Sequence, residues 1–204
     1  MEISQSRDRE GAETMAFAEP LAHKHVTAPR PVPLAYFITF TCYGARLHGN
    51  ASGCVDRGHN RWGTPTLATN PRREAVERKT MCEDSFVMDA PRRDVVLRSM
   101  LEVCSHRGWR PWTVHVRSTH VHVVVEAQTG PERVMNDFKA YASRRLDELG
   151  LDVARRRRWA RHGSTLYIWS VSDLEKRIRY TIEGQGEPMA VFADPGAATS
   201  LSAP

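Results

Sequence analysis

The sequence predicts an α+β fold in which one antiparallel β-sheet carries two helices on the same face, in the order βαββαβ. Three observations lead to this prediction. Short extended segments alternate their side chains with a period of two, the longer segments between them repeat apolar residues at helical spacing, and 204 residues suit one domain of ordinary size. Right-handed crossovers in such a unit place the first and third strands at the centre of the sheet.

Each element follows from a local signal. The first helix begins at Asp89, a capping residue followed by Pro91, and it ends at Gly108. Capping-box patterns at Thr129–Glu132 and Ser172–Glu175 predict the starts of two later helices, which both end near glycines. We therefore expect helices at 89–108, 131–149 and 172–184, and strands at 36–41, 110–116, 120–126 and 166–170.

Both ends of the chain and one long internal segment lack these patterns. We expect residues 1–32 to be a disordered N-terminal arm and residues 188–204 to be a flexible C-terminal tail. The folded domain is expected at 33–187, with a long loop at 44–88. The chain shows no signal-peptide pattern and no apolar run long enough to cross a bilayer. Four cysteines without Cys-x-x-Cys spacing favour a reduced cytoplasmic protein that has no membrane partner.

The charge of the chain favours a polyanionic partner. The formal net charge is +5, and arginine dominates over lysine. Nucleic acid is the first candidate for such a partner and an acidic membrane surface the second. The densest basic segment is Arg155–Arg158, which is either a solvated surface or a set of phosphate contacts.

The stretch from Trp112 to Glu126 is the most informative part of the sequence. His120, His122 and Val124 share one face of the predicted strand at 120–126, and three valines share the other. Two imidazoles on one face, about 7 Å apart at Cα, can bind one divalent cation together with other ligands. The apolar valine face predicts a central strand with its histidine face turned away from the two helices.

Two helical tyrosines differ in their place on the helical wheel. Tyr141 lies on the apolar stripe of Val134 and Phe138, where a packing tyrosine is expected. Tyr180 lies nearly opposite the apolar stripe of its own helix, which is the element expected to approach the histidine face. A phenol placed there can act as a nucleophile, although an ordinary surface tyrosine has the same pattern.

His120-Val-His122 on a strand, followed by Arg179-Tyr180-Thr-Ile-Glu-Gly-Gln185 on the last helix, resembles the HUH class of single-strand DNA transposases. Within that class the chain is most similar to the REP-associated tyrosine transposases and their insertion-sequence relatives, over residues 36–185. The resemblance implies a ferredoxin-like sheet with an additional C-terminal helix that carries the nucleophile. It also implies a divalent metal ion, Mg²⁺ or Mn²⁺, on His120 and His122. Tyr180 would then cut single-stranded or hairpin DNA and form a 5′-phosphotyrosine.

The third metal ligand is open between two residues. The family places an Asn or Gln four positions after the tyrosine, where this chain has Gly184. Glu183 lies nearer the Tyr180 face of an ideal helical wheel, and its charge suits a hard cation. Gln185 turns toward the apolar stripe on that wheel, but a distorted helix end near Gly184 would bring it round.

Basic side chains would hold the DNA backbone in such an enzyme. The candidates are Lys139, Arg144, Arg145, Arg155, Arg156, Arg157 and Arg158. Two other functions share the fold: a non-catalytic protein that binds DNA hairpins, and a small relaxase or replication initiator. The location implied by the resemblance is the nucleoid of a bacterial cytoplasm, and both a monomer and a homodimer with exchanged helices stay open.

Overall fold

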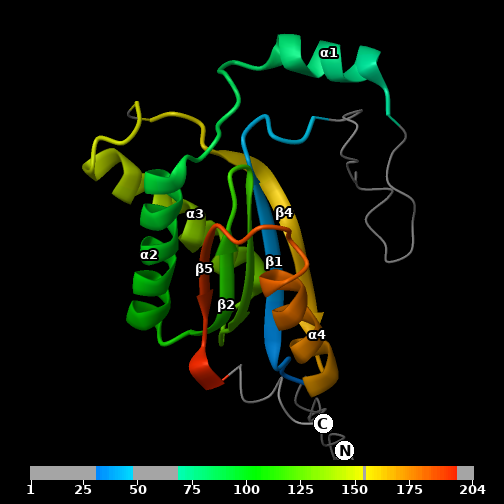
Figure 1. The fold of residues 1–204 in the computed structure, drawn as a ribbon, viewed down its shortest axis with the longest axis vertical. Coiled ribbons are helices and arrows are strands. Elements are labelled where there is room, and N and C mark those ends of the chain that lie inside the picture. Colours follow the sequence, from blue (N-terminus) through cyan, green and yellow to red (C-terminus); the bar gives the residue numbers. More distant parts are fainter. Residues whose placement is uncertain (1–30, 48–68, 154, 197–204) are drawn as a thin grey trace, which may run out of the picture. The chain divides into compact units, whose positions relative to one another are not determined.

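The sheet consists of five antiparallel strands in the spatial order β4-β1-β3-β2-β5 (Figure 1). The computed structural model describes residues 31–47, 69–153 and 155–196, and those from Val32 onward belong to one compact unit. The predicted α+β class is confirmed. The strands are β1 (Ala35–Cys42), β2 (Arg110–Val116), β3 (His120–Glu126), β4 (Trp159–Ile168) and β5 (Ala190–Ala193). The helices are α1 (Pro71–Thr80), α2 (Ala90–Arg107), α3 (Pro131–Glu148) and α4 (Val171–Ile182).

Strand β3 is central, as its valines predicted. It pairs with β1 on one side and with β2 on the other, so that Val123 lies opposite both Ile38 and Val114. Val121, Val123 and Val125 are completely buried. Because side chains alternate along the strand, this pairing also fixes the opposite direction for His120 and His122.

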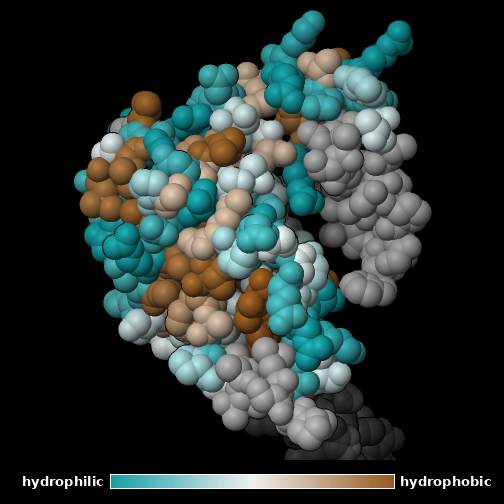
Figure 2. Space-filling view, viewed as in Figure 1, coloured by the Kyte–Doolittle hydropathy of each residue, from teal (hydrophilic) through white to brown (hydrophobic). Residues whose placement is uncertain are grey.

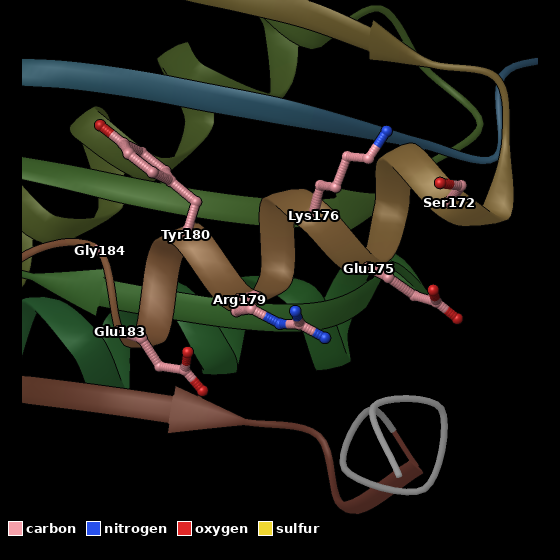
Figure 3. A pocket seen from close by; sticks show the side chains of 7 residues that line it. All are labelled: Ser172, Glu175, Lys176, Arg179, Tyr180, Glu183 and Gly184. Atoms are coloured by element: carbon pink, nitrogen blue, oxygen red, sulfur yellow. The ribbon is translucent and has the colours of Figure 1, made fainter. Parts of the chain in front are cut away.

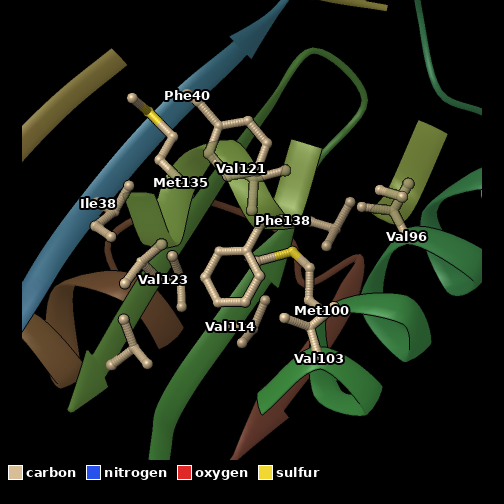
Figure 4. Packing of buried hydrophobic residues seen from close by; sticks show 14 of the residues in the cluster. Ile38, Phe40, Val96, Met100, Val103, Val114, Val121, Val123, Met135 and Phe138 are labelled. Atoms are coloured by element: carbon tan, nitrogen blue, oxygen red, sulfur yellow. The ribbon is translucent and has the colours of Figure 1, made fainter. Parts of the chain in front are cut away.

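The valine face of the sheet packs against α2 and α3. Phe138 from α3 and Met100 from α2 meet the valines in the main core (Figure 4). Helix α2 begins as predicted, since the Asp89 carboxylate accepts the Arg92 N–H, and it ends at Gly108 in the left-handed conformation. The predicted capping box before α3 is wrong: Gly130 is the N-cap and no side chain caps this helix.

The opposite face of the sheet packs against α4 (Figure 1). Leu174 and Ile178 from this helix pack on Phe37, Val124 and Ile168 in a second, smaller core. The N-cap of this helix lies two residues before the predicted Ser172, because Ser170 accepts the capping bond from the Asp173 N–H. Its outer surface is mostly hydrophilic (Figure 2).

Three elements differ from the sequence prediction. Strand β4 begins at Trp159, before the strand predicted at 166–170, because its pairing with β1 is long-range and its first half shows no clear local alternation. Strand β5 lies where a flexible tail was expected from residue 188, since Val114 of β2 pairs with Phe192. Helix α1 lies inside the expected loop at 44–88, and none of its residues is buried.

Two of the domain predictions fall largely outside the described residues, namely the N-terminal arm at 1–32 and the middle of the loop at 44–88. Among the helices that the structure describes, none combines the length and the apolar character needed to cross a lipid bilayer.

Candidate active site

The two histidines of β3 lie side by side on the α4 face of the sheet. Their ring centroids are 4.9 Å apart with the rings nearly perpendicular. His122 is 5% exposed, whereas His120 is half-buried. Each has a threonine hydroxyl at its Nδ1: Thr39 Oγ1 at 2.8 Å from His122, and Thr119 Oγ1 at 3.2 Å from His120. A threonine hydroxyl can accept a hydrogen bond from Nδ1–H, and in that tautomer the Nε2 lone pair is free.

The Nε2 atom of His122 is buried and has no hydrogen-bond partner among the described residues. A buried polar atom without a partner costs free energy and calls for an explanation. Histidines that bind metals have this arrangement, because one ring nitrogen meets the metal and the other is held by a hydrogen bond that orients the ring.

Burial keeps both imidazoles neutral. Burial first, and the positive charge of Arg46 second, lower the pKa of His120 to about 4. Burial likewise lowers the pKa of His122 to about 3, with repulsion from His120 as the second cause. The neutral imidazole is the form that binds a metal ion, so both side chains are ready for that role at neutral pH.

Tyr180 lies next to the histidines, at the C-terminal part of α4. Its ring meets the His122 ring edge-on at 5.7 Å and the Phe37 ring edge-on at 5.9 Å between centroids. Phe37 also stacks on His122 at 5.6 Å, so it touches both. Tyr180 is 44% exposed, which keeps its phenol open to a substrate. Tyr141 instead packs partly buried against the main core, as its place on the wheel predicted.

Gln185 is the residue that the structure places beside the two histidines. Its side chain lies close enough to oppose the lowering of both histidine pKa values, although it makes no hydrogen bond of ordinary geometry to His122 Nε2. Gln185 Nε2 donates a 3.4 Å hydrogen bond to the Tyr180 carbonyl, which ties this side chain to the last turn of α4.

Glu183, the other candidate for the third ligand, does not form a group with the two histidines in the described part of the chain. Glu183 and Tyr180 project from α4 in different directions (Figure 3). In the described ranges no three His, Cys, Asp or Glu side chains form a group that could hold a metal ion. The physical reason is that α4 ends at Ile182, after which Gly186 adopts a φ of 71°. The chain therefore leaves the helical wheel before Gln185.

Two of the seven predicted DNA contacts serve the fold instead. Lys139 is buried, and its Nζ donates to the carbonyls of Ala160 (2.9 Å) and His162 (3.2 Å) on β4. The Arg158 side chain is 1% exposed and pairs with Asp147 at 2.6 Å and with Asp152 at 3.1 Å. Both cations are committed to the fold, which a reading of charge along the sequence does not reveal.

The other five have mixed surroundings. Arg145 pairs with Glu102 and Glu148, and Arg156 pairs with Asp152 and also donates to two backbone carbonyls. Arg144, Arg155 and Arg157 are exposed. Helix α3, which carries Arg144 and Arg145, packs on the sheet face opposite the histidines. The basic side chains on the candidate site itself were missed: Lys176 and Arg179 line a surface groove of about 560 Å³ beside Tyr180.

His115 and Arg117 are further residues that the sequence reading passed over. The short turn between β2 and β3 sets their register, so His115 lies directly opposite His122. That register is a signal the sequence did contain. His115 is completely buried, and Arg117 Nη1 donates a 3.1 Å hydrogen bond to the Glu187 carbonyl.

Comparisons with known proteins add little to this geometry. No family model matches the chain, and no curated protein matches it either. A solved structure described as "Structure of the REP associates tyrosine transposase bound to a REP hairpin" aligns with a TM-score of 0.41 and 10% sequence identity. The alignment covers 78% of this chain and 72% of that one. A likeness at this level leaves the family of the chain unassigned.

Proposed function

We propose that the protein is a metal-dependent tyrosine transposase, a nickase and strand transferase that acts on single-stranded or hairpin DNA. One observation carries the proposal: Tyr180 packs edge-on against His122, whose buried Nε2 has no partner among the described residues. A tyrosine phenol, two neutral imidazoles and the Gln185 side chain thus lie together at one partly open place.

The residues present suit a divalent cation. His120 and His122 would supply two nitrogen ligands and Gln185 one oxygen ligand, which leaves positions open for phosphate oxygens and water. Such a donor set favours Mn²⁺ over Mg²⁺, because Mg²⁺ prefers oxygen ligands alone. A cation held there would withdraw charge from a phosphate oxygen and make the phosphorus easier to attack.

The proposed reaction conserves a phosphoester bond. The Tyr180 oxygen attacks phosphorus, a tyrosine–phosphorus bond forms, and the bond from phosphorus to the 3′ oxygen breaks. The tyrosine proton passes to solvent, and the leaving 3′ oxygen takes up a proton. The products are a 5′-phosphotyrosine and a free 3′-OH. A second 3′-OH can reverse the step and join a new strand without an external energy source.

The surface around Tyr180 suits an extended DNA strand. Lys176 and Arg179 lie beside the tyrosine along the groove on α4 (Figure 3), where they can meet phosphates. Glu175 and Glu183 line the same groove, so the phosphate contacts would be local. A non-catalytic protein that binds DNA hairpins is the alternative, and formation of a covalent adduct distinguishes the two.

The test is a covalent-adduct assay with strand polarity. The protein is incubated with a pool of hairpin and unstructured single-stranded oligonucleotides labelled at the 3′ or the 5′ end, with Mn²⁺ or with EDTA. We expect the 3′ label to remain on the protein in a denaturing gel when Mn²⁺ is present, and the 5′ label to be released. Retention of the 5′ label, or an equal adduct in EDTA, would contradict the proposal.

A further inference from the structure

We propose that His115 is a positioning residue that holds the turn after α4 so that Gln185 and Tyr180 lie against the two histidines of β3. This inference rests on the proposed function and deepens it. His115 would touch neither the cation nor the DNA, because both of its ring nitrogens are already engaged within the protein.

The two hydrogen bonds of His115 fix its tautomer. Its Nδ1–H donates to the Thr181 carbonyl on α4 at 2.9 Å, and its Nε2 accepts the Met189 N–H at 3.3 Å. The ring is completely buried in β2, directly opposite His122. His122 has a free buried nitrogen and His115 has none, which separates a candidate ligand from a support.

The bonds from His115 hold both ends of the segment that contains Gln185. Thr181 follows Tyr180 in the last turn of α4, and Met189 immediately precedes β5. Between these points the chain turns through Gly186, and Arg117 binds the Glu187 carbonyl as a third tie. A turn held at both ends and in its second half has few ways to move Gln185 away from the imidazoles.

Thr113 on the same strand separates positioning from simple stability. It is as fully buried as His115, and its Oγ1 donates a 2.9 Å hydrogen bond to the Phe192 carbonyl of β5. This bond therefore also ties β2 to the C-terminal segment, but at Phe192, which follows the turn at residues 183–189 in the chain. If docking of that segment were the whole role of His115, loss of either bond would have the same effect on the site.

The experiment compares three variants of the full chain. His115→Phe keeps a ring and removes both hydrogen bonds, His115→Gln keeps a donor and an acceptor, and Thr113→Val removes the control bond. For each we would measure the Kd for Mn²⁺, the kcat and KM of adduct formation, the urea unfolding midpoint and hydrogen exchange of the amides of residues 183–189.

We expect His115→Phe to raise the Kd for Mn²⁺ about 10-fold or more and to lower kcat with little change in KM for DNA. Exchange at residues 183–189 should rise in the same variant, and His115→Gln should restore most of each property. Thr113→Val should shift the unfolding midpoint but leave Mn²⁺ affinity and exchange in the turn unchanged.

Equal effects of His115→Phe and Thr113→Val on Mn²⁺ affinity, or no effect of either, would overturn the positioning role. Failure of the function itself looks different. If the wild-type protein neither binds Mn²⁺ nor forms an adduct, the proposed function is wrong. In that case the exchange data, measured without metal, still decide whether His115 holds the turn.

Discussion

Replacing Gly184 with alanine should displace the ring of Tyr180. A Cβ atom at Gly184 would lie 2.8 Å from the Tyr180 carbonyl oxygen and 2.9 Å from its ring atom Cδ2. Neither distance is tolerated between non-bonded atoms. The Tyr180 carbonyl is restrained, because it accepts hydrogen bonds from the Gly184 N–H at 3.0 Å and from Gln185 Nε2. The Tyr180 ring can turn away from the new Cβ atom, whereas the contact with the carbonyl oxygen is relieved only by a small shift of the backbone at the end of α4, and both changes move the phenol.

The cost should fall on catalysis rather than on folding. Overpacking of this kind costs about 1–3 kcal/mol, and the low end of that range applies because Tyr180 is 44% exposed at a helix end. A nucleophile displaced by about 1 Å can lose roughly 100-fold in rate. We therefore predict a fall of about 100-fold in the rate of adduct formation by Gly184→Ala, with a folded protein.

The assay is single-turnover adduct formation at saturating DNA and Mn²⁺. Gly130→Ala is the matched control, since a Cβ atom there meets nothing within 4 Å and its φ of −64° suits any residue. The control should react at the wild-type rate. The reasoning is refuted if Gly184→Ala reacts as fast as the wild type, or if Gly130→Ala is equally slow.

Three further predictions follow from the same geometry. Gln185→Ala should weaken Mn²⁺ binding about 10-fold or more, and Glu183→Ala should leave it unchanged in a titration. Arg158→Met should destabilise the protein by about 2 kcal/mol in urea unfolding, because the buried Asp152 carboxylate then keeps only its longer, 3.5 Å pair with Arg156, whereas Arg155→Gln should change stability little. The lowered pKa of His122 means that the unfolded chain takes up a proton first. The metal-free protein should therefore keep its full stability above pH 6.5 and become less stable as the pH falls toward about 3. His122→Asn should reduce that dependence, and the part that remains comes from His120, whose pKa is also lowered.

Each of these predictions has an outcome that would contradict it. The reverse ranking of Glu183 and Gln185 would mean that the turn after α4 rearranges when metal binds. Equal stability of the two arginine variants would remove the structural role of Arg158. A wild-type protein as stable in urea at pH 5 as at pH 7 would show that His122 is not desolvated in the fold.

Local alternation explains how much of the site the sequence could predict. The valines of β3 indicated which way His120 and His122 point, because Val121, Val123 and Val125 form one wholly apolar face and side chains alternate along a strand. The apolar stripe of α4 then placed Tyr180 off the core and on the histidine side. Both inferences needed only residues close to one another in the sequence.

Long-range contacts explain what the sequence could not predict. The helical wheel misplaced Gln185 because it assumes a helix that continues, whereas α4 ends at Ile182. Lys139 looked like a free cation because its carbonyl partners lie on β4, a strand without a clear local pattern in its first half. The four residues of β5 are too short a signal alone, and they form a strand because β2 offers its edge.

The most direct test of the central claim is to identify the amino acid that bears the DNA. Adduct formed with Mn²⁺ is digested and mapped by mass spectrometry, and Tyr180→Phe and Tyr141→Phe are compared with the wild type. We expect the phosphodeoxynucleotide on Tyr180. Tyr180→Phe should form no adduct while keeping its Mn²⁺ affinity and melting temperature, and Tyr141→Phe should form adduct normally. An adduct that survives in Tyr180→Phe, or that maps to Tyr141, would contradict the account.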